Sequence, residues 1–255
     1  MLLQGKRILI TGVINQWSAA WAIALAIVAE GGEVGFTYLN DKARDNISDL
    51  CSDSGIVPAF ILGCDVGSDQ QIDQLAVDVQ SVWPQFDGFL HSIAHANRED
   101  LGGAYLNVTR EGFMHALDIS AYSFTALARV FHPMLRPGSS LVTLSYLGAE
   151  RAVLNYNVMG VAKAALEASV RYLARDLGTD NIRVNALSPG VLKTLSARGI
   201  SDFSSLLDYF ESRVLLSEPV NTSSVAGSAV YLFSDLSKVV TGEVIHVDAG
   251  FHVIA

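Results

Sequence analysis

The amino-acid sequence predicts an α/β protein with a doubly wound, seven-stranded parallel sheet, folded as a single domain over residues 1–255. Short runs of β-branched and aliphatic residues alternate with longer helical patterns along the whole chain, which is the order of right-handed βαβ units. Half of the residues are hydrophobic and 17% are charged, so the chain can bury a large core. No repeat, low-complexity segment or linker divides it.

The expected strands are short and apolar, as strands covered by helices on both faces should be. They span Arg7–Ile10, Glu33–Tyr38, Pro58–Leu62, Gly88–Ile93, Ser139–Tyr146, Ile182–Leu187 and Glu243–Val247. The clearest helical patterns span Ser18–Glu30, about Asn107–Leu135, Tyr156–Leu177 and Thr222–Phe233. Because Pro and Gly end helices, the Pro137-Gly138 pair is expected to separate the second of these helices from the strand after it.

Charge and composition argue against several classes of function. A net charge of −9 disfavours nucleic acid as a partner, because phosphate contacts need a concentrated basic face. The longest apolar run, Ala19–Ala29, is too short to span a membrane, and the first residues lack a signal-peptide pattern. We therefore expect a cytoplasmic protein without a membrane segment. Cys51 and Cys64 have no CxxC spacing, and the histidines do not cluster with other ligand types, so no metal site is expected.

Small and polar residues follow four successive strands, where the carboxyl ends of a parallel sheet bind ligands. They are Gly12 and Ser18 after the first strand, Asn40 near Lys42 and Arg44 after the second, Asp65 and Val66 after the third, and Ser92–Ala96 after the fourth. Ser18 opens a helix, whose N-terminus suits an anion, although the G-x-G-x-x-G fingerprint is absent. Each position alone could be an ordinary loop, but the four together favour a dinucleotide.

The segment from residue 144 to residue 163 carries two tyrosines and a lysine. Tyr156 and Lys163 lie seven residues apart on an expected helix, about two turns, and so share a face. A phenol and an ammonium on one face can act as a proton donor and the cation that tunes it. The alternative is a tyrosine packed on a core helix beside a lysine whose stem covers apolar surface.

This segment resembles the short-chain dehydrogenases/reductases and, within them, the enoyl-acyl-carrier-protein reductases of bacterial fatty-acid synthesis. Ordinary members of the superfamily place a tyrosine four residues before the lysine, whereas Met159 stands there in this chain. Tyr156 seven residues before Lys163, with Tyr146 ten residues further upstream, is typical of the enoyl reductases. Further matches are Ser145–Arg151, Asn155–Gly160, Gly12-x5-Ser18, Asp65-Val66, His91-Ser92-Ile93, Thr194-Leu195 and Ser234-Asp235-Leu236.

The resemblance implies a Rossmann-like fold, a homotetramer and the reduction of trans-2-enoyl thioesters on acyl carrier protein. The hydride would come from NADH, with NADPH not excluded. By this resemblance, Tyr156 hydrogen-bonds the thioester carbonyl and Lys163 binds the nicotinamide ribose. Tyr146 would line the substrate site and assist catalysis by Tyr156 and Lys163, and Ala96 would contact the acyl substrate. Residues 197–216 would form a mobile substrate lid.

The resemblance also implies a set of cofactor-binding positions along the chain. These are Gly12, Ser18 and Ala19 at the pyrophosphate, Asn40 at the adenosine ribose, Asp65 and Val66 at the adenine, Ile93 near the adjoining ribose, and Leu192, Lys193, Thr194, Leu195 and Ser196 over the nicotinamide.

The chain departs from the family pattern around the cofactor and in the lid. Alanine stands at positions 22, 94 and 249, where glycine is usual, and Asn40 stands for a glutamine. The lid carries Ser201, Asp202, Ser204, Ser205, Asp208 and Glu211, where basic residues suited to an acidic carrier are usual. An altered carrier interface and ordinary divergence of a solvated surface are both consistent with this. The alternatives are a carbonyl or imine reductase, and a nucleotide-binding protein without catalysis.

Overall fold

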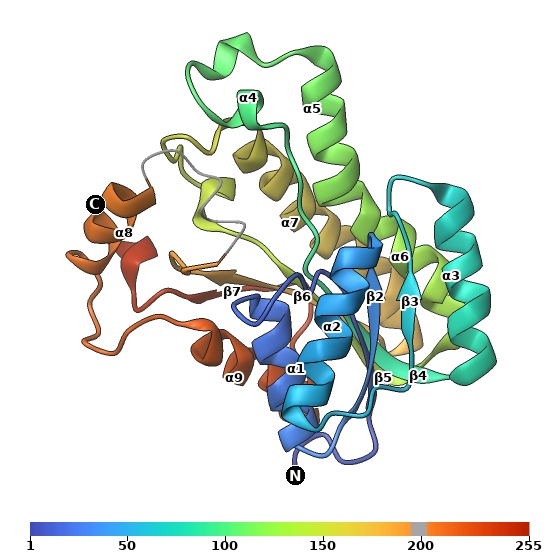
Figure 1. Cartoon of the computed structure of the whole chain (residues 1–255). Helices are drawn as coiled ribbons and strands as arrows, with labels where there is room; N and C mark the ends of the chain where they lie inside the picture. Colours follow the sequence, from blue (N-terminus) through green and yellow to red (C-terminus); the bar gives the residue numbers. More distant parts are fainter. Residues whose placement is uncertain (195–202, 255) are drawn as a thin grey trace.

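The computed structural model describes residues 1–194 and 203–254 of the chain. It contains one sheet of seven parallel strands with helices on both faces (Figure 1), which confirms the predicted doubly wound α/β fold. The strands are β1 (Arg7–Ile10), β2 (Glu33–Tyr38), β3 (Ile61–Gly63), β4 (Phe86–His91), β5 (Leu135–Leu144), β6 (Arg183–Pro189) and β7 (Val244–Val247).

The strand order is β3-β2-β1-β4-β5-β6-β7, so the chain reverses direction across the sheet between β1 and β4. β1 pairs with β2 through Ile10 and Phe36, and with β4 through Ile10 and Leu90. The crevice beyond the carboxyl ends of β1 and β4 is the place where open α/β sheets bind ligands.

Two layers of helices cover the sheet. The helices are α1 (Ala19–Ala29), α2 (Asp41–Ser54), α3 (Asp69–Val82), α4 (Arg98–Leu101), α5 (Arg110–Leu117), α6 (Ser123–Phe131), α7 (Asn157–Leu177), α8 (Phe203–Glu211) and α9 (Thr222–Phe233). One core lies under α1, α2 and α9 and includes Ile10, Ile23 and Phe233. The other lies under α3, α6 and α7 and includes Phe89, Phe124 and Leu166.

The prediction of one continuous helix over about Asn107–Leu135 is wrong, although most of this region is helical. Its apolar pattern is continuous, but the backbone divides into α5, a π-helical turn over Asp118–Tyr122 and α6. A 3₁₀ turn over His132–Met134, with a proline in its first turn, ends this region.

Pro137-Gly138 lies inside β5 and does not precede it. The register between β4 and β5 shifts here, so this part of β5 bulges and its proline needs no ladder partner. β3 is also shorter than expected and begins at Ile61, three residues after Pro58.

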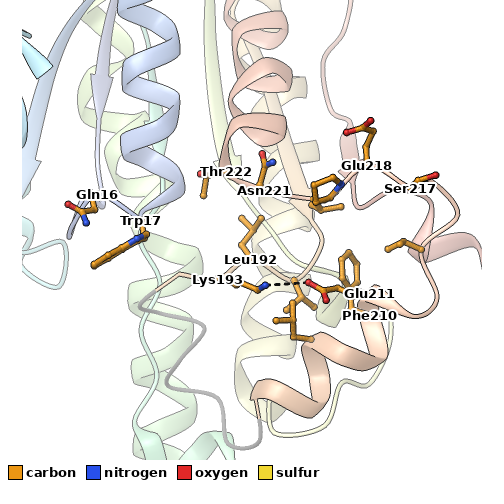
Figure 2. A pocket seen from close by; sticks show the side chains of 15 residues that line it. Gln16, Trp17, Leu192, Lys193, Phe210, Glu211, Ser217, Glu218, Asn221 and Thr222 are labelled. Atoms are coloured by element: carbon orange, nitrogen blue, oxygen red, sulfur yellow. Dashed lines mark ion pairs between the residues drawn. The ribbon is translucent and has the colours of Figure 1, made fainter.

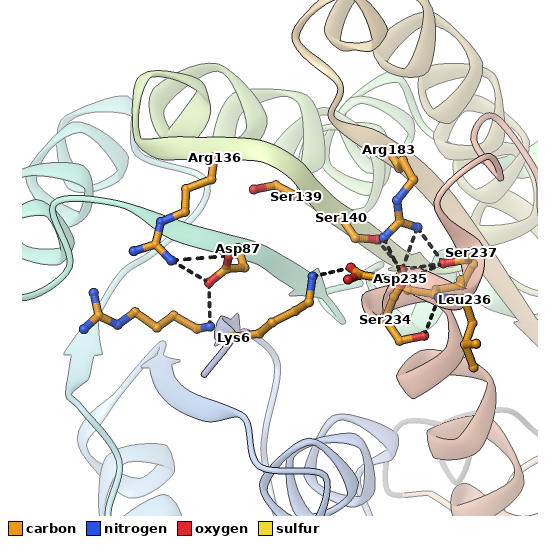
Figure 3. Close-up of polar contacts among 12 residues, drawn as sticks. Lys6, Asp87, Arg136, Ser139, Ser140, Arg183, Ser234, Asp235, Leu236 and Ser237 are labelled. Atoms are coloured by element: carbon orange, nitrogen blue, oxygen red, sulfur yellow. Dashed lines mark hydrogen bonds and ion pairs between the residues drawn. The ribbon is translucent and has the colours of Figure 1, made fainter. Parts of the chain in front are cut away.

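Polar contacts join the amino ends of the strands to the turn after α9 (Figure 3). Lys6 Nζ pairs with Asp235 Oδ1 at 2.8 Å. The buried guanidinium of Arg183 donates to the carbonyl of Leu232 at 2.8 Å and to the hydroxyl of Ser237 at 2.7 Å. The Ser234-Asp235-Leu236 segment therefore stabilises the edge of the sheet opposite the ligand crevice.

Candidate active site

The crevice is built on a close contact between the loops after β1 and β4. Gly12 has φ +80°, and a Cβ atom at this position would lie 2.0 Å from the carbonyl oxygen of Ser92. Thr11 reinforces the contact, because its hydroxyl accepts a hydrogen bond from the Ser92 N–H at 3.2 Å. Only glycine allows this approach and this backbone conformation.

Ser18 and Ala19 complete the loop after β1. The Ser18 hydroxyl accepts hydrogen bonds from the N–H groups of Ile14 and Asn15, each at 3.1 Å, and so closes the loop upon itself. Ala19 begins α1, whose first turn carries no acidic residue. The positive end of the α1 dipole is thus available to an anion beside Gly12.

The next two strand ends carry side chains with local structural partners. Asn40 Oδ1 accepts from the Ala43 N–H at 3.1 Å and caps α2. Asp65 Oδ1 accepts from the Gly67 N–H at 2.9 Å and shapes the turn in which Val66 is buried. Their roles toward a cofactor stay predictions.

The positions after β4 lie beside α5. Ile93 is partly buried and packs against the core under α3, α6 and α7. The N–H of His95 donates to the Ser120 hydroxyl at 2.9 Å, and its ring nitrogen lies 2.8 Å from that of His115 on α5. These bonds hold the loop that carries the half-buried Ala96.

The structure brings the two tyrosines together. Tyr146 follows β5 and Tyr156 precedes the first residue of α7; their rings meet edge to face with centroids 4.9 Å apart and planes at 65°. Burial raises the pKa of Tyr146 to about 12, and burial together with Tyr146 raises the pKa of Tyr156 above its ordinary value. Both phenols are therefore protonated at neutral pH and can donate hydrogen bonds.

Lys163 lies two turns along α7 and is 6% exposed. Its Nζ donates to the carbonyl oxygen of Leu144, the last residue of β5, at 2.7 Å. Burial lowers the pKa of Lys163 to about 8, and the charge of Glu167 acts in the opposite direction. Because an ammonium has three hydrogens, the bond to Leu144 leaves two for a ligand.

Two glycines set the distance between the tyrosines, and their role was not predicted from the sequence. A Cβ atom at Gly148 would lie 2.4 Å from Cδ1 of Tyr156, and one at Gly160 would lie 2.7 Å from the carbonyl oxygen of Gly148. The turn after β5 therefore packs directly on α7. Both glycines belong to the segment that carries the resemblance, which was the available signal.

The segment after β6 lines a cavity of about 550 Å³, together with Gln16 and Trp17 of the loop after β1. Figure 2 shows Leu192 and Lys193 in this cavity, with Gln16 and Trp17 on one side and Phe210 on another. Lys193 pairs with Glu211 of α8 at 3.5 Å. The N–H of Thr194 donates to the carbonyl of Leu192 at 2.8 Å.

Part of the expected lid is a helix. Residues 197–216 have no regular sequence pattern, yet Phe203–Glu211 forms α8, with Phe210 buried as its anchor. Leu195, Ser196 and the first six residues of the expected lid lie outside the described residues. The mobility of the lid stays a prediction.

The geometry fits a dinucleotide. The loops after β1 and β4 approach closely at Gly12, and the N-terminus of α1 carries no acidic residue in its first turn. Lys163 is bonded to the end of β5, the strand that Tyr146 follows, and that bond uses one of its three hydrogens. Among residues 1–194 and 203–254, no three His, Cys, Asp or Glu side chains form a metal-binding group, and no helix is long and apolar enough to cross a membrane.

Known proteins are similar to this chain in sequence and in fold. Residues 12–252 match the family described as Enoyl-(Acyl carrier protein) reductase. The chain is 50% identical over 254 residues to the NADH-dependent enoyl-[acyl-carrier-protein] reductase FabI of Salmonella typhimurium, covering 99% of this chain and 96% of that protein. It is 45% identical over 253 residues to FabI of Bacillus subtilis, with 99% and 98% covered.

Solved structures agree. The enoyl-acyl carrier protein reductase of Bacillus cereus, in complex with NADP+ and indole naphthyridinone, has a TM-score of 0.97 at 45% identity and covers 100% of this chain and 99% of its own. The reductase of Anaplasma phagocytophilum, in complex with NAD, has a TM-score of 0.93 at 40% identity, with 100% and 95% covered. The chain thus belongs to the enoyl-(acyl carrier protein) reductase family of the short-chain dehydrogenases/reductases.

Proposed function

We propose that this chain reduces trans-2-enoyl thioesters on acyl carrier protein to saturated acyl thioesters with NADH, as a step of fatty acid biosynthesis. Family membership supports the reaction, because relatives 45–50% identical over almost the whole chain are NADH-dependent enoyl-acyl-carrier-protein reductases. The observation that supports it within this chain is the Tyr146–Tyr156 pair beside the buried Lys163.

A nicotinamide bound in the crevice would supply a hydride for the β-carbon of the substrate. Negative charge then develops on the thioester oxygen, and the protonated phenol of Tyr156 donates a hydrogen bond to it. A proton from water, taken up at the α-carbon of the resulting enolate, completes the saturated product. A donor fixed in this way is worth on the order of 10²–10³ in rate. Lys163 directs its two remaining hydrogens to the ribose hydroxyls, and its charge favours the developing anion. Tyr146 packs on the Tyr156 ring and closes the substrate side against water.

The proposed cofactor contacts follow the strand ends. Gly12, Ser18 and Ala19 bind the pyrophosphate, Asn40 lies at the adenosine ribose, Asp65 and Val66 bind the adenine, Ile93 lies near the adjoining ribose, Ala96 contacts the acyl group, and Leu192–Ser196 cover the nicotinamide. Charges near the ribose support NADH over NADPH. Arg44, a candidate partner of a 2′-phosphate, is already paired with Asp41 at 3.3 Å and Asp45 at 3.1 Å.

A second candidate is the reduction of a different enoyl thioester in a dedicated pathway. It is favoured by α8, which carries Asp208 and Glu211 and no basic residue. Like charges slow the association of this surface with an acidic carrier. An enoyl group on coenzyme A is not attached to a carrier protein, so its reduction does not require α8 to approach an acidic protein surface.

One experiment tests both candidates. NADH oxidation is followed with enoyl-acyl carrier protein and with enoyl-coenzyme A of matched chain length, and each assay is repeated with NADPH. We expect the carrier-linked substrate and NADH to give the higher kcat/KM. Preference for coenzyme A supports the second candidate. Cofactor binding without turnover of any enoyl thioester, or turnover of ketoacyl thioesters alone, contradicts the proposal.

We also propose a homotetramer in the cytoplasm. The large apolar side chains exposed on α5, the following π turn and α7 support subunit contacts there: Met114 is 63% exposed, Tyr122 44% and Tyr172 68%. Light scattering after gel filtration is expected to give four times the 27.3 kDa chain mass. A monomer contradicts this part of the proposal.

A further inference from the structure

A buried carboxylate, that of Glu167, is bonded to the residue next to Tyr146. Glu167 is one helical turn beyond Lys163 on α7, so the two side chains share a face of the helix. Glu167 is 7% exposed, and its Oε1 accepts a hydrogen bond from the Ser145 hydroxyl at 2.5 Å. Ser145 is the residue immediately before Tyr146.

The surroundings of Glu167 make a purely structural role costly. Burying a charged group is unfavourable unless it is paired and hydrogen-bonded. Burial raises the pKa of Glu167, and the bond from Ser145 acts against this effect. The other charged or titratable groups nearby are Lys163 and Arg171 on α7, Glu150 from the turn after β5, and His246 from β7.

We propose that Glu167 is a positioning residue for the reduction, an inference that rests on the function proposed above. Its carboxylate fixes Ser145, and thereby holds the backbone of Tyr146 so that its ring meets Tyr156. Its negative charge also stabilises the ammonium of Lys163 on the next turn of the helix.

The charge makes a distinct contribution. The pKa of Lys163 is already lowered to about 8 by burial, with Glu167 opposing the shift. His91 of β4 also faces this region, and burial lowers its pKa to about 3, so between pH 6 and 9.5 it is neutral and adds no charge beside Lys163. Loss of the Glu167 charge therefore lowers the Lys163 pKa further, and the ammonium is lost at a lower pH.

The test is the pH dependence of kcat between pH 6 and 9.5 for Glu167→Gln. We expect its alkaline limb to move to lower pH by on the order of one unit, as for removal of a neighbouring opposite charge. The amide carbonyl still accepts from Ser145, so kcat near pH 6.5 stays within a few-fold of wild type. Glu167→Asp keeps the charge, and the alkaline limb of its kcat profile is expected to lie at the same pH as in the wild type. Asp176→Asn, an exposed change on the same helix, is the matched control and should shift nothing.

Ser145→Ala tests the positioning contribution. It removes the hydroxyl that Glu167 holds and is expected to lower kcat at every pH with the KM for NADH unchanged. Circular dichroism reports whether each variant folds. Glu167→Met removes the charge together with the acceptor of the Ser145 hydroxyl. If Glu167→Gln does not fold, the pH dependence of Glu167→Met compared with that of Ser145→Ala decides the charge contribution.

Three results would overturn the inference while leaving the proposed function intact. They are a Glu167→Gln profile that overlays the wild type, a uniform loss of kcat without a shift of the limb, and a Ser145→Ala variant with wild-type kcat. Absence of enoyl reduction by the wild-type protein would instead contradict the proposed function.

Discussion

The rings of Tyr146 and Tyr156 meet edge to face at 4.9 Å although one belongs to the loop after β5 and the other to the start of α7. The contact depends on Gly148, the residue at which a side chain would enter the space of the Tyr156 ring. The turn and the start of the helix therefore pack as one unit that fixes the two rings against each other.

Replacement of the phenol tests its role as a donor. Tyr156→Phe is expected to lower kcat for enoyl reduction by about ten-fold or more, because a preorganised hydrogen bond to the developing oxyanion is lost. The dissociation constant for NADH should stay within about two-fold, measured by quenching of protein fluorescence. Tyr231→Phe, a change on α9 away from the proposed site and the proposed subunit contacts, is the control. Unchanged kcat in Tyr156→Phe would remove this residue from its assigned role.

A methyl group at Gly148 tests the packing of the turn on α7. Gly148→Ala places a Cβ atom 2.4 Å from the Tyr156 ring, so the ring must move. We expect kcat to fall by about ten-fold or more, since small displacements of a positioned group are costly in rate. Gly178→Ala at the end of the same helix meets no atom within 4 Å and should leave kcat unchanged. Equal kcat values for the two variants would show that the close contact is not needed.

Residues that follow the strands, and residues at a regular spacing along a helix, could be placed from the sequence. The alternation of strands and helices placed Gly12, Asp65 and Ile93 after β1, β3 and β4, and the seven-residue step placed Lys163 on α7 two turns after Tyr156, the residue before that helix. The close packing of Gly148 against Tyr156 and the bond between Ser145 and Glu167 were not predicted. Both join residues whose separation in space depends on how the turn after β5 folds back on the helix.

Some helix boundaries and caps were also not predicted from the sequence. Ser68 caps α3 by accepting from the Gln71 N–H, a capping-box spacing visible in the sequence. The apolar pattern between α5 and α6 is continuous through the π-helical turn, so periodicity alone could not locate that break. Asn40 caps α2 through its Oδ1, a local role that was not predicted, and its place at the adenosine ribose stays a prediction.

Acid should destabilise the fold through His91. This histidine is fully buried, its ring nitrogens bond Thr143 and Ser123 at 2.8 Å, and burial with the charge of Lys163 lowers its pKa to about 3. Its ordinary pKa is 6.5, so the unfolded chain takes up a proton that the folded chain resists. The stability due to neutral His91 is complete above pH 6.5 and is lost as the pH falls toward 3.

The free energy of unfolding falls by at most about 1.4 kcal/mol per pH unit when one proton is taken up on unfolding. Urea unfolding at pH 7, 6, 5 and 4 measures it. His91→Gln is expected to flatten the dependence over this range, whereas His132→Gln, at an exposed histidine paired with Asp180, should not. Identical slopes for wild type and His91→Gln would assign the acid sensitivity to other groups.

Ala249 is a strained residue that glycine should relieve. Its φ of 53° lies in the left-handed region, which costs an alanine about 1–2 kcal/mol. Its carbonyl accepts from the N–H groups of Leu215 at 2.8 Å and Leu216 at 3.3 Å, so the end of the lid region holds this conformation in place. Ala249→Gly removes the steric cost but adds about 0.5–1 kcal/mol of conformational entropy to the unfolded chain. We expect a net gain of about 0.5–1 kcal/mol in the free energy of unfolding, measured in urea.

The reverse change at Gly55 is the control for Ala249→Gly. Gly55 has φ +69°, and a Cβ atom added there would meet no other atom within 4 Å, so Gly55→Ala changes only the backbone cost. It should lower the free energy of unfolding by an amount similar to the gain in Ala249→Gly, because the same steric and entropic contributions enter with opposite sign. A loss of stability in Ala249→Gly would show that the methyl group of Ala249 contributes packing that outweighs the strain.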